Sequence, residues 1–230
     1  MIIGIHQPAY LPWLGYFDRI RSVDLFIFLD TVQFQKGSFQ NRNKVMTQTG
    51  SKWLTIPVET AGKFYDTTLK DLRVDNKQRW QSKHWSTLKM NYGSAPAFDS
   101  ISGEIKGFYY ETWAFLADLC WEMLLVFNRL LGLKTPMIKA SELGEIDGQK
   151  SDLVLNLCRE VGAHTYLSGS QGRNYLNEPS FAASGIKVEY QNFSPIPYHQ
   201  RSETFVPTLG IVDFLFNETE PVKTFTRMQS

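Results

Sequence analysis

The feature that most constrains the fold is the start of the chain, where a short apolar run leads directly into a polar and aromatic turn. Ile2, Ile3 and Ile5 are β-branched and uninterrupted by charge, which is typical of a strand buried on both faces of a parallel sheet. His6 and Gln7 then stand at the carboxyl end of that strand. Ligands of open α/β sheets bind outside the carboxyl ends of strands, so both side chains are site candidates, and a structural role explains them equally well.

A helix is expected after this turn. Pro8 and Pro12 each fix their own φ and favour extended conformations in the preceding residue, so the helix should begin near Pro12. The apolar stripe of the helix would consist of Trp13, Tyr16, Phe17 and Ile20. Aromatic stripes at helical spacing usually belong to a core, but Tyr10 and Tyr16 lie close enough to the polar turn to contact a ligand.

The remaining pattern alternates strands and helices. A second buried strand is predicted over residues 24–30, where Asp30 ends it as His6 ends the first. Further strands are expected at 45–47 and 53–58 as a hairpin, and at 69–74, 165–167 and 186–193. Helices are expected at 78–92, within 108–133, at 151–161 and at 209–216. This order predicts an α/β fold with a mostly parallel sheet flanked by helices. The sheet would be mixed if the antiparallel hairpin were part of it.

Length, charge and cysteine content bound the class of protein. A chain of 230 residues can form one domain or two, and we expect a single domain over 1–230. A net charge of +1 without long runs of one sign argues against a nucleic-acid partner and favours a small molecule. No secretory pattern is seen at the N-terminus, and charges interrupt the apolar segment 108–133, so neither a signal peptide nor a membrane span is predicted. The two cysteines, Cys120 and Cys158, are expected to be buried thiols of a cytoplasmic protein.

Several alternatives stay open at this point. The helix that contains Cys120 can pack inside one chain or join two copies into a homodimer. The four histidines show no metal-ligand spacing, so no metal site is predicted, and the sequence points to no particular cofactor. A serine nucleophile is equally unsupported, because no Gly-x-Ser-x-Gly elbow is present.

A polar segment follows the second predicted strand and contains Gln33, Lys36, Asn41, Arg42 and Asn43. Guanidinium groups bind phosphate or carboxylate through two parallel hydrogen bonds, and side-chain amides bind hydroxyl groups. The segment is therefore a candidate for substrate binding. A solvated loop before the hairpin is the alternative.

A second group of candidates lies in the last third of the chain. Ser168 and Tyr175 bound a glycine-containing loop after the strand at 165–167, and such loops can direct backbone N–H groups at an anion. A plain turn explains the same residues. His199 and Gln200 are further candidates for contact with a substrate.

These motifs resemble the WbqC-like protein family. The resemblance is carried by residues 6–17, Asp30, Gln33-Phe34, Asn41-Arg42-Asn43, 53–58, 166–169, Tyr175, 198–200, 205–207 and 209–217. The family is bacterial and often encoded among genes for O-antigen and other surface polysaccharides, so the resemblance implies a setting more than a reaction. The N-terminal strand, turn and helix are also similar in layout to nucleotidyltransferase-like enzymes, although Tyr16 stands where those enzymes carry a second histidine.

The leading hypothesis is an enzyme of surface-polysaccharide biosynthesis that transfers or ligates a group onto a nucleotide-activated amino sugar. In this hypothesis His6 or Asp30 takes the proton from the nucleophile, while Arg42, Lys36 and the helix after Pro12 hold phosphates. His6, Asp30 and Arg42 are expected to share one pocket at the same rim of the sheet. One alternative is an ATP-dependent, amide-forming ligase of nucleotidyltransferase-like fold. The other is a non-catalytic sugar-nucleotide binding or scaffold protein.

Overall fold

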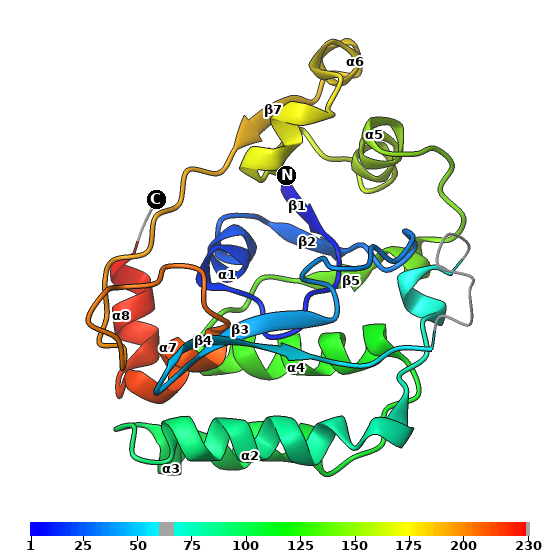
Figure 1. Ribbon diagram of the computed structural model, residues 1–230. Coiled ribbons are helices and arrows are strands. Elements are labelled where there is room, and N and C mark those ends of the chain that lie inside the picture. The colour runs from blue at the N-terminus through cyan, green and yellow to red at the C-terminus, as the bar shows by residue number, and fades with distance from the viewer. Residues whose placement is uncertain (60–66, 229–230) are drawn as a thin grey trace.

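The computed structural model describes residues 1–59 and 67–228. A five-stranded sheet lies at its centre, with the order β5–β2–β1–β6–β7 and every neighbouring pair parallel (Figure 1). The strands are β1 (Ile2–His6), β2 (Leu25–Phe28), β5 (Met137–Lys139), β6 (Thr165–Ser168) and β7 (Lys187–Tyr190). The predicted α/β fold is thus confirmed, and the sheet is wholly parallel.

The predicted hairpin forms a separate antiparallel sheet. It consists of β3 (Arg42–Thr47) and β4 (Gly50–Thr55), with Arg42 opposite Thr55 and Thr47 opposite Gly50. In Figure 1 the hairpin lies between the central sheet and α4, on the side that also carries α1. It therefore helps to cover one face of the protein instead of extending the parallel sheet.

Helices cover both faces of the central sheet (Figure 1). One face packs against the larger hydrophobic cluster, which draws on α1 (Leu14–Arg21), α2 (Trp80–Tyr92), α3 (Phe98–Lys106), α4 (Leu116–Leu130), α7 (Ile211–Asn217) and α8 (Pro221–Arg227). The other face packs against a smaller cluster with α5 (Ser151–Glu160) and α6 (Glu178–Ala183). No helix in the described residues is long and apolar enough to cross a bilayer.

The β1 sequence explains why the site develops on one face. Successive residues of a strand point to opposite faces, so Ile3 and Ile5 pack with the α5 side while Gly4 and His6 face α1. Phe26 and Phe28 of β2 likewise belong to the α1 side. On that side β1 therefore contributes a glycine and a histidine where its neighbour contributes two large rings.

Some expected elements were wrong. Residues 69–74 do not form a strand: Leu69–Asp71 is a 3₁₀ turn, and Leu69 and Leu72 are both fully buried. Their spacing of three places both side chains on the same side of a turn, which a strand would separate. The long helix begins only at Leu116, because Gly107–Tyr109 forms its own 3₁₀ turn.

Several short elements had no clear signal in the sequence. They are α3, α6, α8 and β5. The thiols behave as expected, because Cys120 in α4 and Cys158 in α5 are both buried and unpaired. Burial raises the pKa of Cys158 to about 12, so it is an unreactive thiol.

Candidate functional site

The candidate site lies where the strand order reverses. Along the chain the sheet grows from β1 to β2 and β5, then returns to place β6 and β7 on the other side of β1. Ligands of such sheets bind in the crevice outside the carboxyl ends of the two strands at this point, which are β1 and β6. His6 ends β1 and Ser168 ends β6, so two predicted site residues lie at this rim.

His6 is half-buried and held in a defined orientation. Its Nδ1–H donates to the backbone oxygen of Gln7 at 2.9 Å, and its ring lies 4.5 Å from the ring of Tyr16. The Tyr16 hydroxyl donates to the same Gln7 oxygen at 3.2 Å. Burial, with a smaller contribution from the nearby Arg19 charge, lowers the pKa of His6 to about 3. The imidazole is therefore neutral, and its Nε2 presents a lone pair.

Arg19 is the cation beside His6, and sequence reasoning missed it. Its side chain crosses β1 over Gly4 and ends against Gly169, directly after β6. The residue is only 9% exposed, and burial lowers the pKa of its guanidinium. Its Nε and Nη2 both donate to Gln191 Oε1, at 3.2 and 3.0 Å. The sequence offers only a charged residue between Phe17 and Ile20 of the predicted stripe, and such a residue is normally assigned to solvent.

Gln191 connects this arginine to the start of α1. Its Nε2 donates to the Gly15 oxygen at 2.8 Å and to the Asp18 carboxylate. Asp18 is fully buried and pairs with Arg21 at 2.7 Å, so its charge is neutralised there. These contacts fix the Gln191 amide with its oxygen toward Arg19.

Asp30 follows β2, but its carboxylate is engaged elsewhere. It is buried, and its two oxygens accept from the Ser141 backbone N–H at 3.0 Å and the Ser141 hydroxyl at 2.6 Å. Ser141 belongs to the 3₁₀ turn Ala140–Leu143 that follows β5. Asp30 thus holds the turn after the edge strand.

The polar loop after β2 is tied to the rim by an amide pair. Gln40 Nε2 donates to Gln7 Oε1 at 2.6 Å, and the Tyr10 backbone N–H donates to the Phe39 oxygen at 3.2 Å. Gln33 and Lys36 are exposed in this loop. Of the predicted binding residues, Gln7, Gln33 and Lys36 therefore belong to a loop and turn that touch each other.

Of the next three candidates, Arg42 and Asn43 belong to β3, and Asn41 directly precedes it. Asn41 Nδ2 donates to the Ile56 oxygen at 2.8 Å, and Asn43 Nδ2 donates to the Leu11 oxygen at 2.6 Å. Arg42 donates to the Gly37 oxygen, and its guanidinium lies 4.3 Å from the centre of the Trp53 ring. Asn41 Oδ1 and Arg42 Nε have no partner in the part of the chain that the structure describes.

The segment after β6 approaches Arg19 from the other side. Ser168 is buried, and its hydroxyl donates to the Gly169 oxygen at 3.1 Å. Tyr175 is 43% exposed and lies close enough to Arg19 to act on its pKa. The rim therefore gathers His6, Tyr16, Arg19, Gly169 and Tyr175.

The remaining candidates lie away from this rim. Tyr10 is fully buried, and its hydroxyl bonds His84 Nδ1 at 2.9 Å and the Tyr109 hydroxyl at 2.8 Å. Gln200 is buried and exchanges two hydrogen bonds with the Val206 backbone, at 2.8 and 3.1 Å. Its neighbour His199 is exposed.

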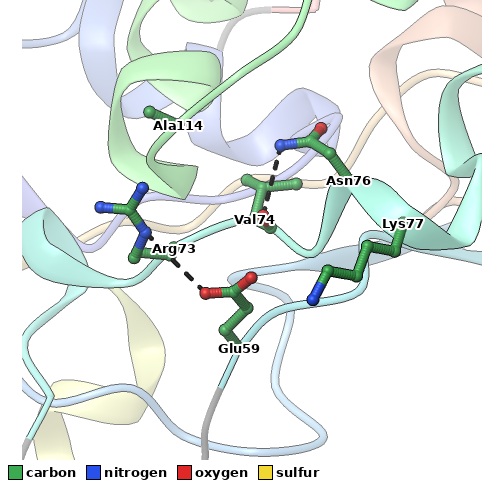
Figure 2. Close-up of a pocket in the computed structure, with 6 residues that line it drawn as sticks. All are labelled: Glu59, Arg73, Val74, Asn76, Lys77 and Ala114. Carbon is green, nitrogen blue, oxygen red and sulfur yellow. Dashed lines mark hydrogen bonds and ion pairs between the residues drawn. The ribbon is translucent and has the colours of Figure 1, made fainter.

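Two surface depressions lie outside the immediate rim. Figure 2 shows one of about 320 Å³, lined by Glu59, Arg73, Val74, Asn76, Lys77 and Ala114. It contains no predicted site residue, and its Arg73–Glu59 ion pair is exposed, with 3.8 Å between Nε and Oε2. The other, of about 300 Å³, lies beside β6 and β7 and shares Gln191 with the Arg19 contact. Only this second cavity borders the candidate site.

Together, the fold and rim define a parallel α/β protein with a candidate small-molecule site where its strand order reverses. The sequence matches the WbqC-like protein family over residues 7–223, so the chain belongs to that family. It is 33% identical over 217 residues to the uncharacterized protein Rv1507c of Mycobacterium tuberculosis, covering 94% of this chain and 93% of that protein. No solved structure matches it significantly. Among the described residues, no group of three or more His, Cys, Asp or Glu side chains is placed to hold a metal ion.

Proposed function

We propose that this protein binds a nucleotide-activated sugar in the crevice outside the carboxyl ends of β1 and β6, and transfers or ligates a group onto its amino function. The biological setting, assembly of a bacterial surface polysaccharide, is what family membership suggests. The single observation that carries the proposal is the convergence of a neutral imidazole and a buried guanidinium at the point of strand reversal.

His6 is the group best placed to receive a proton. Its Nδ1–H bond to Gln7 fixes the tautomer, so Nε2 can accept a hydrogen bond from an amine or hydroxyl nucleophile. A base with a pKa of about 3 is weak at neutral pH. An anionic ligand beside Arg19 would offset the charge that contributes to this low pKa, and so would strengthen the base when substrate is present.

The neighbouring loop supplies the polar contacts to the sugar in this proposal. Gln7 and Gln33 present amides, and Lys36 adds a positive charge, on a turn and a loop joined by the Gln40–Gln7 pair. Asp30 shapes the same rim by holding Ser141 in place. Gln7 comes from the turn after β1, and Asp30, Gln33 and Lys36 come from the segment between β2 and β3. Loops that follow strands carry many of the binding residues of α/β proteins.

Mass spectrometry of reactions with pure protein tests the proposal. The protein would be incubated with candidate sugar nucleotides, amino acids and ATP, and the products identified. We expect turnover by the wild type, loss of it in His6→Ala, and its retention in the matched control His164→Ala, since His164 is exposed at the start of β6. Turnover that survives both His6→Ala and Asp30→Ala would refute the catalytic assignment, and binding without turnover would favour a scaffold.

The strand order also favours a second candidate, an ATP-dependent amide ligase. Numbered along the chain, the five strands of the sheet stand in the order third, second, first, fourth, fifth, which occurs in doubly wound nucleotide-binding folds. This candidate requires release of pyrophosphate that depends on ATP and on the acceptor amine. Turnover without ATP consumption would exclude it.

A further inference from the structure

Arg19 is the one Lys or Arg among the buried residues that the structure describes, and it takes part in no ion pair. Asp18 pairs with Arg21 at 2.7 Å, whereas no carboxylate of the described residues lies within ion-pair distance of Arg19. Within the part of the chain that the structure describes, its one hydrogen-bond acceptor is the neutral amide oxygen of Gln191. A buried cation without an anionic partner lowers the stability of a folded protein, because its charge is removed from water without compensation. An anionic ligand that binds there would supply the missing partner.

Two glycines leave space for the Arg19 side chain. A Cβ at Gly4 would lie 3.3 Å from Arg19 Cγ, and a Cβ at Gly169 would lie 2.3 Å from Arg19 Nη2. Gly169 has φ −74° and ψ 164°, which any residue adopts, so the backbone conformation does not require glycine there. What requires glycine is the volume that the guanidinium fills beside the end of β6.

The Arg19 guanidinium also has N–H donors that make no hydrogen bond to the described residues. Gln191 takes bonds from Nε and Nη2 and is itself fixed by Gly15 and Asp18. Nη1 has no partner in the described residues, and it is not among the fully enclosed polar atoms that lack one. The fork is therefore held rigidly, with donors left over that are not sealed from solvent.

We propose that Arg19 is the anion-binding residue of the site, and that it receives phosphoryl oxygens of the ligand between His6 and Gly169. A guanidinium fork binds phosphate through two parallel hydrogen bonds, and a pre-oriented fork loses little entropy on binding. The location of the anion site rests on the structure alone. Its assignment to the phosphates of a nucleotide sugar rests on the proposed function.

A consequence for His6 makes the site measurable without turnover. The Arg19 charge contributes to the low pKa of the imidazole, so a bound phosphate should raise the pKa of His6 toward its ordinary value. Arg19 thereby couples phosphate binding to the readiness of His6 to accept a proton. An arginine that only supports the fold would produce no such response.

NMR spectroscopy of the full chain with ¹⁵N-labelled arginine and histidine tests this directly, with inorganic pyrophosphate as the probe. We expect one arginine Nε–H signal, absent in Arg19→Lys, to shift on titration, and the His6 pKa to rise. The pyrophosphate dissociation constant should increase at least tenfold in Arg19→Lys and change less than twofold in the control Arg129→Lys, whose side chain is exposed in an ion pair with Glu104. Acetate should bind at least tenfold more weakly than pyrophosphate.

A second variant guards against a folding defect in Arg19→Lys. Gly169→Ala keeps Arg19 but places a methyl group where its guanidinium lies, and should also weaken pyrophosphate binding at least tenfold. An Arg19 signal that stays fixed at saturating pyrophosphate, or equal binding of acetate, would overturn the proposal. If Arg19 responds but no sugar nucleotide is turned over, the proposed reaction fails and the anion site stands. If turnover occurs while Arg19 does not respond, the anion site fails alone.

Discussion

Two buried polar clusters of this protein differ in how fully their hydrogen-bonding capacity is used. Asp213 in α7 is completely buried and accepts from the hydroxyls of Tyr92, at 2.7 Å, and Tyr198, at 2.9 Å. The Tyr92 hydroxyl in turn accepts from the Met46 backbone N–H at 2.8 Å. The cluster around Arg19 is less enclosed, since Arg19 is 9% exposed, and among the described residues its guanidinium has one neutral acceptor and unused donors.

This difference separates support of the fold from binding of a ligand. A satisfied network such as that of Asp213 joins α7, α2 and the hairpin, and its groups gain nothing from solvent or ligand. A partly satisfied cluster lowers stability, and proteins retain such clusters mainly where function requires them. The position of Arg19 at the strand reversal agrees with that interpretation.

The largest effect is expected from removing the satisfied carboxylate. Asp213→Ala leaves the buried hydroxyls of Tyr92 and Tyr198 without an acceptor, and should lower the free energy of unfolding by about 3 kcal/mol. Urea denaturation followed by circular dichroism measures this. Asp213→Asn keeps one acceptor oxygen and should lower the free energy of unfolding by less than Asp213→Ala. Equal losses in the two variants would show that the lost stability does not come from unpaired tyrosine hydroxyls.

The two clusters should also respond to pH with opposite signs. The pKa of His6 is lowered to about 3 from 6.5, so the unfolded chain binds the proton first and His6 reduces stability as pH falls from about 6.5 toward 3. Allowing for half-burial, the expected loss in the free energy of unfolding is about 2 kcal/mol, and this loss should vanish in His6→Gln.

Asp213 should show the opposite dependence on pH. Burial raises the pKa of Asp213, so its contribution to the free energy of unfolding is present below the unfolded-state pKa and is lost as pH rises through the folded-state value. Unfolding measured against pH for wild type, His6→Gln and Asp213→Asn distinguishes the signs; identical profiles for all three would contradict the comparison.

A carboxylate introduced beside Arg19 should compete with the ligand. Gln191→Glu places a negative charge on the side chain that already contacts Nε and Nη2, and should weaken pyrophosphate binding about tenfold, or about 1.4 kcal/mol. Asn192→Asp is the matched control, because it adds the same charge at an exposed neighbouring position in the same cavity. Isothermal titration calorimetry measures the pyrophosphate affinity of both variants. Equal weakening in the two would show that general charge repulsion, and not a contact with Arg19, causes the effect.

The smallest effect is expected on the hairpin. Arg42→Ala removes the contact with the Trp53 ring at 4.3 Å and should lower the free energy of unfolding by about 0.5–1 kcal/mol. Pyrophosphate affinity, measured by the same calorimetry, should change less than twofold. A tenfold loss would make Arg42, and not Arg19, the phosphate-binding cation of this protein.

The sequence was sufficient for the elements whose patterns are strong. The apolar runs that became β1 and β2, and the aromatic stripe of α1, each point to one structure, and the resemblance to the family is confirmed. The segment at 69–74 failed because a short alternation of apolar and polar residues also suits a turn that buries Leu69 and Leu72. Short elements such as β5 depend on their neighbours in the sheet for stability, so they leave little local pattern.

The positions of the candidate site residues in the fold could be predicted only in part. His6 and Gln7 could be located because a strand end is visible in the sequence. Arg19 could not, since a charged residue in a helix is normally assigned to solvent, and its burial depends on glycines that lie far apart along the chain. The expectation that Arg42 and Asp30 join His6 in one pocket used only the order of the elements. In the structure, Arg42 lies over Trp53, Asp30 binds Ser141, and the guanidinium that acts on His6 is that of Arg19.

The most direct test of the central claim is a crystal structure of the protein with a bound uridine diphosphate sugar. The account predicts that the diphosphate lies within hydrogen-bond distance of Arg19 Nη1, with the sugar toward His6 and Gln7. A diphosphate bound instead at Arg42, or in the depression lined by Glu59 and Arg73, with Arg19 still bonded only to Gln191, would contradict it.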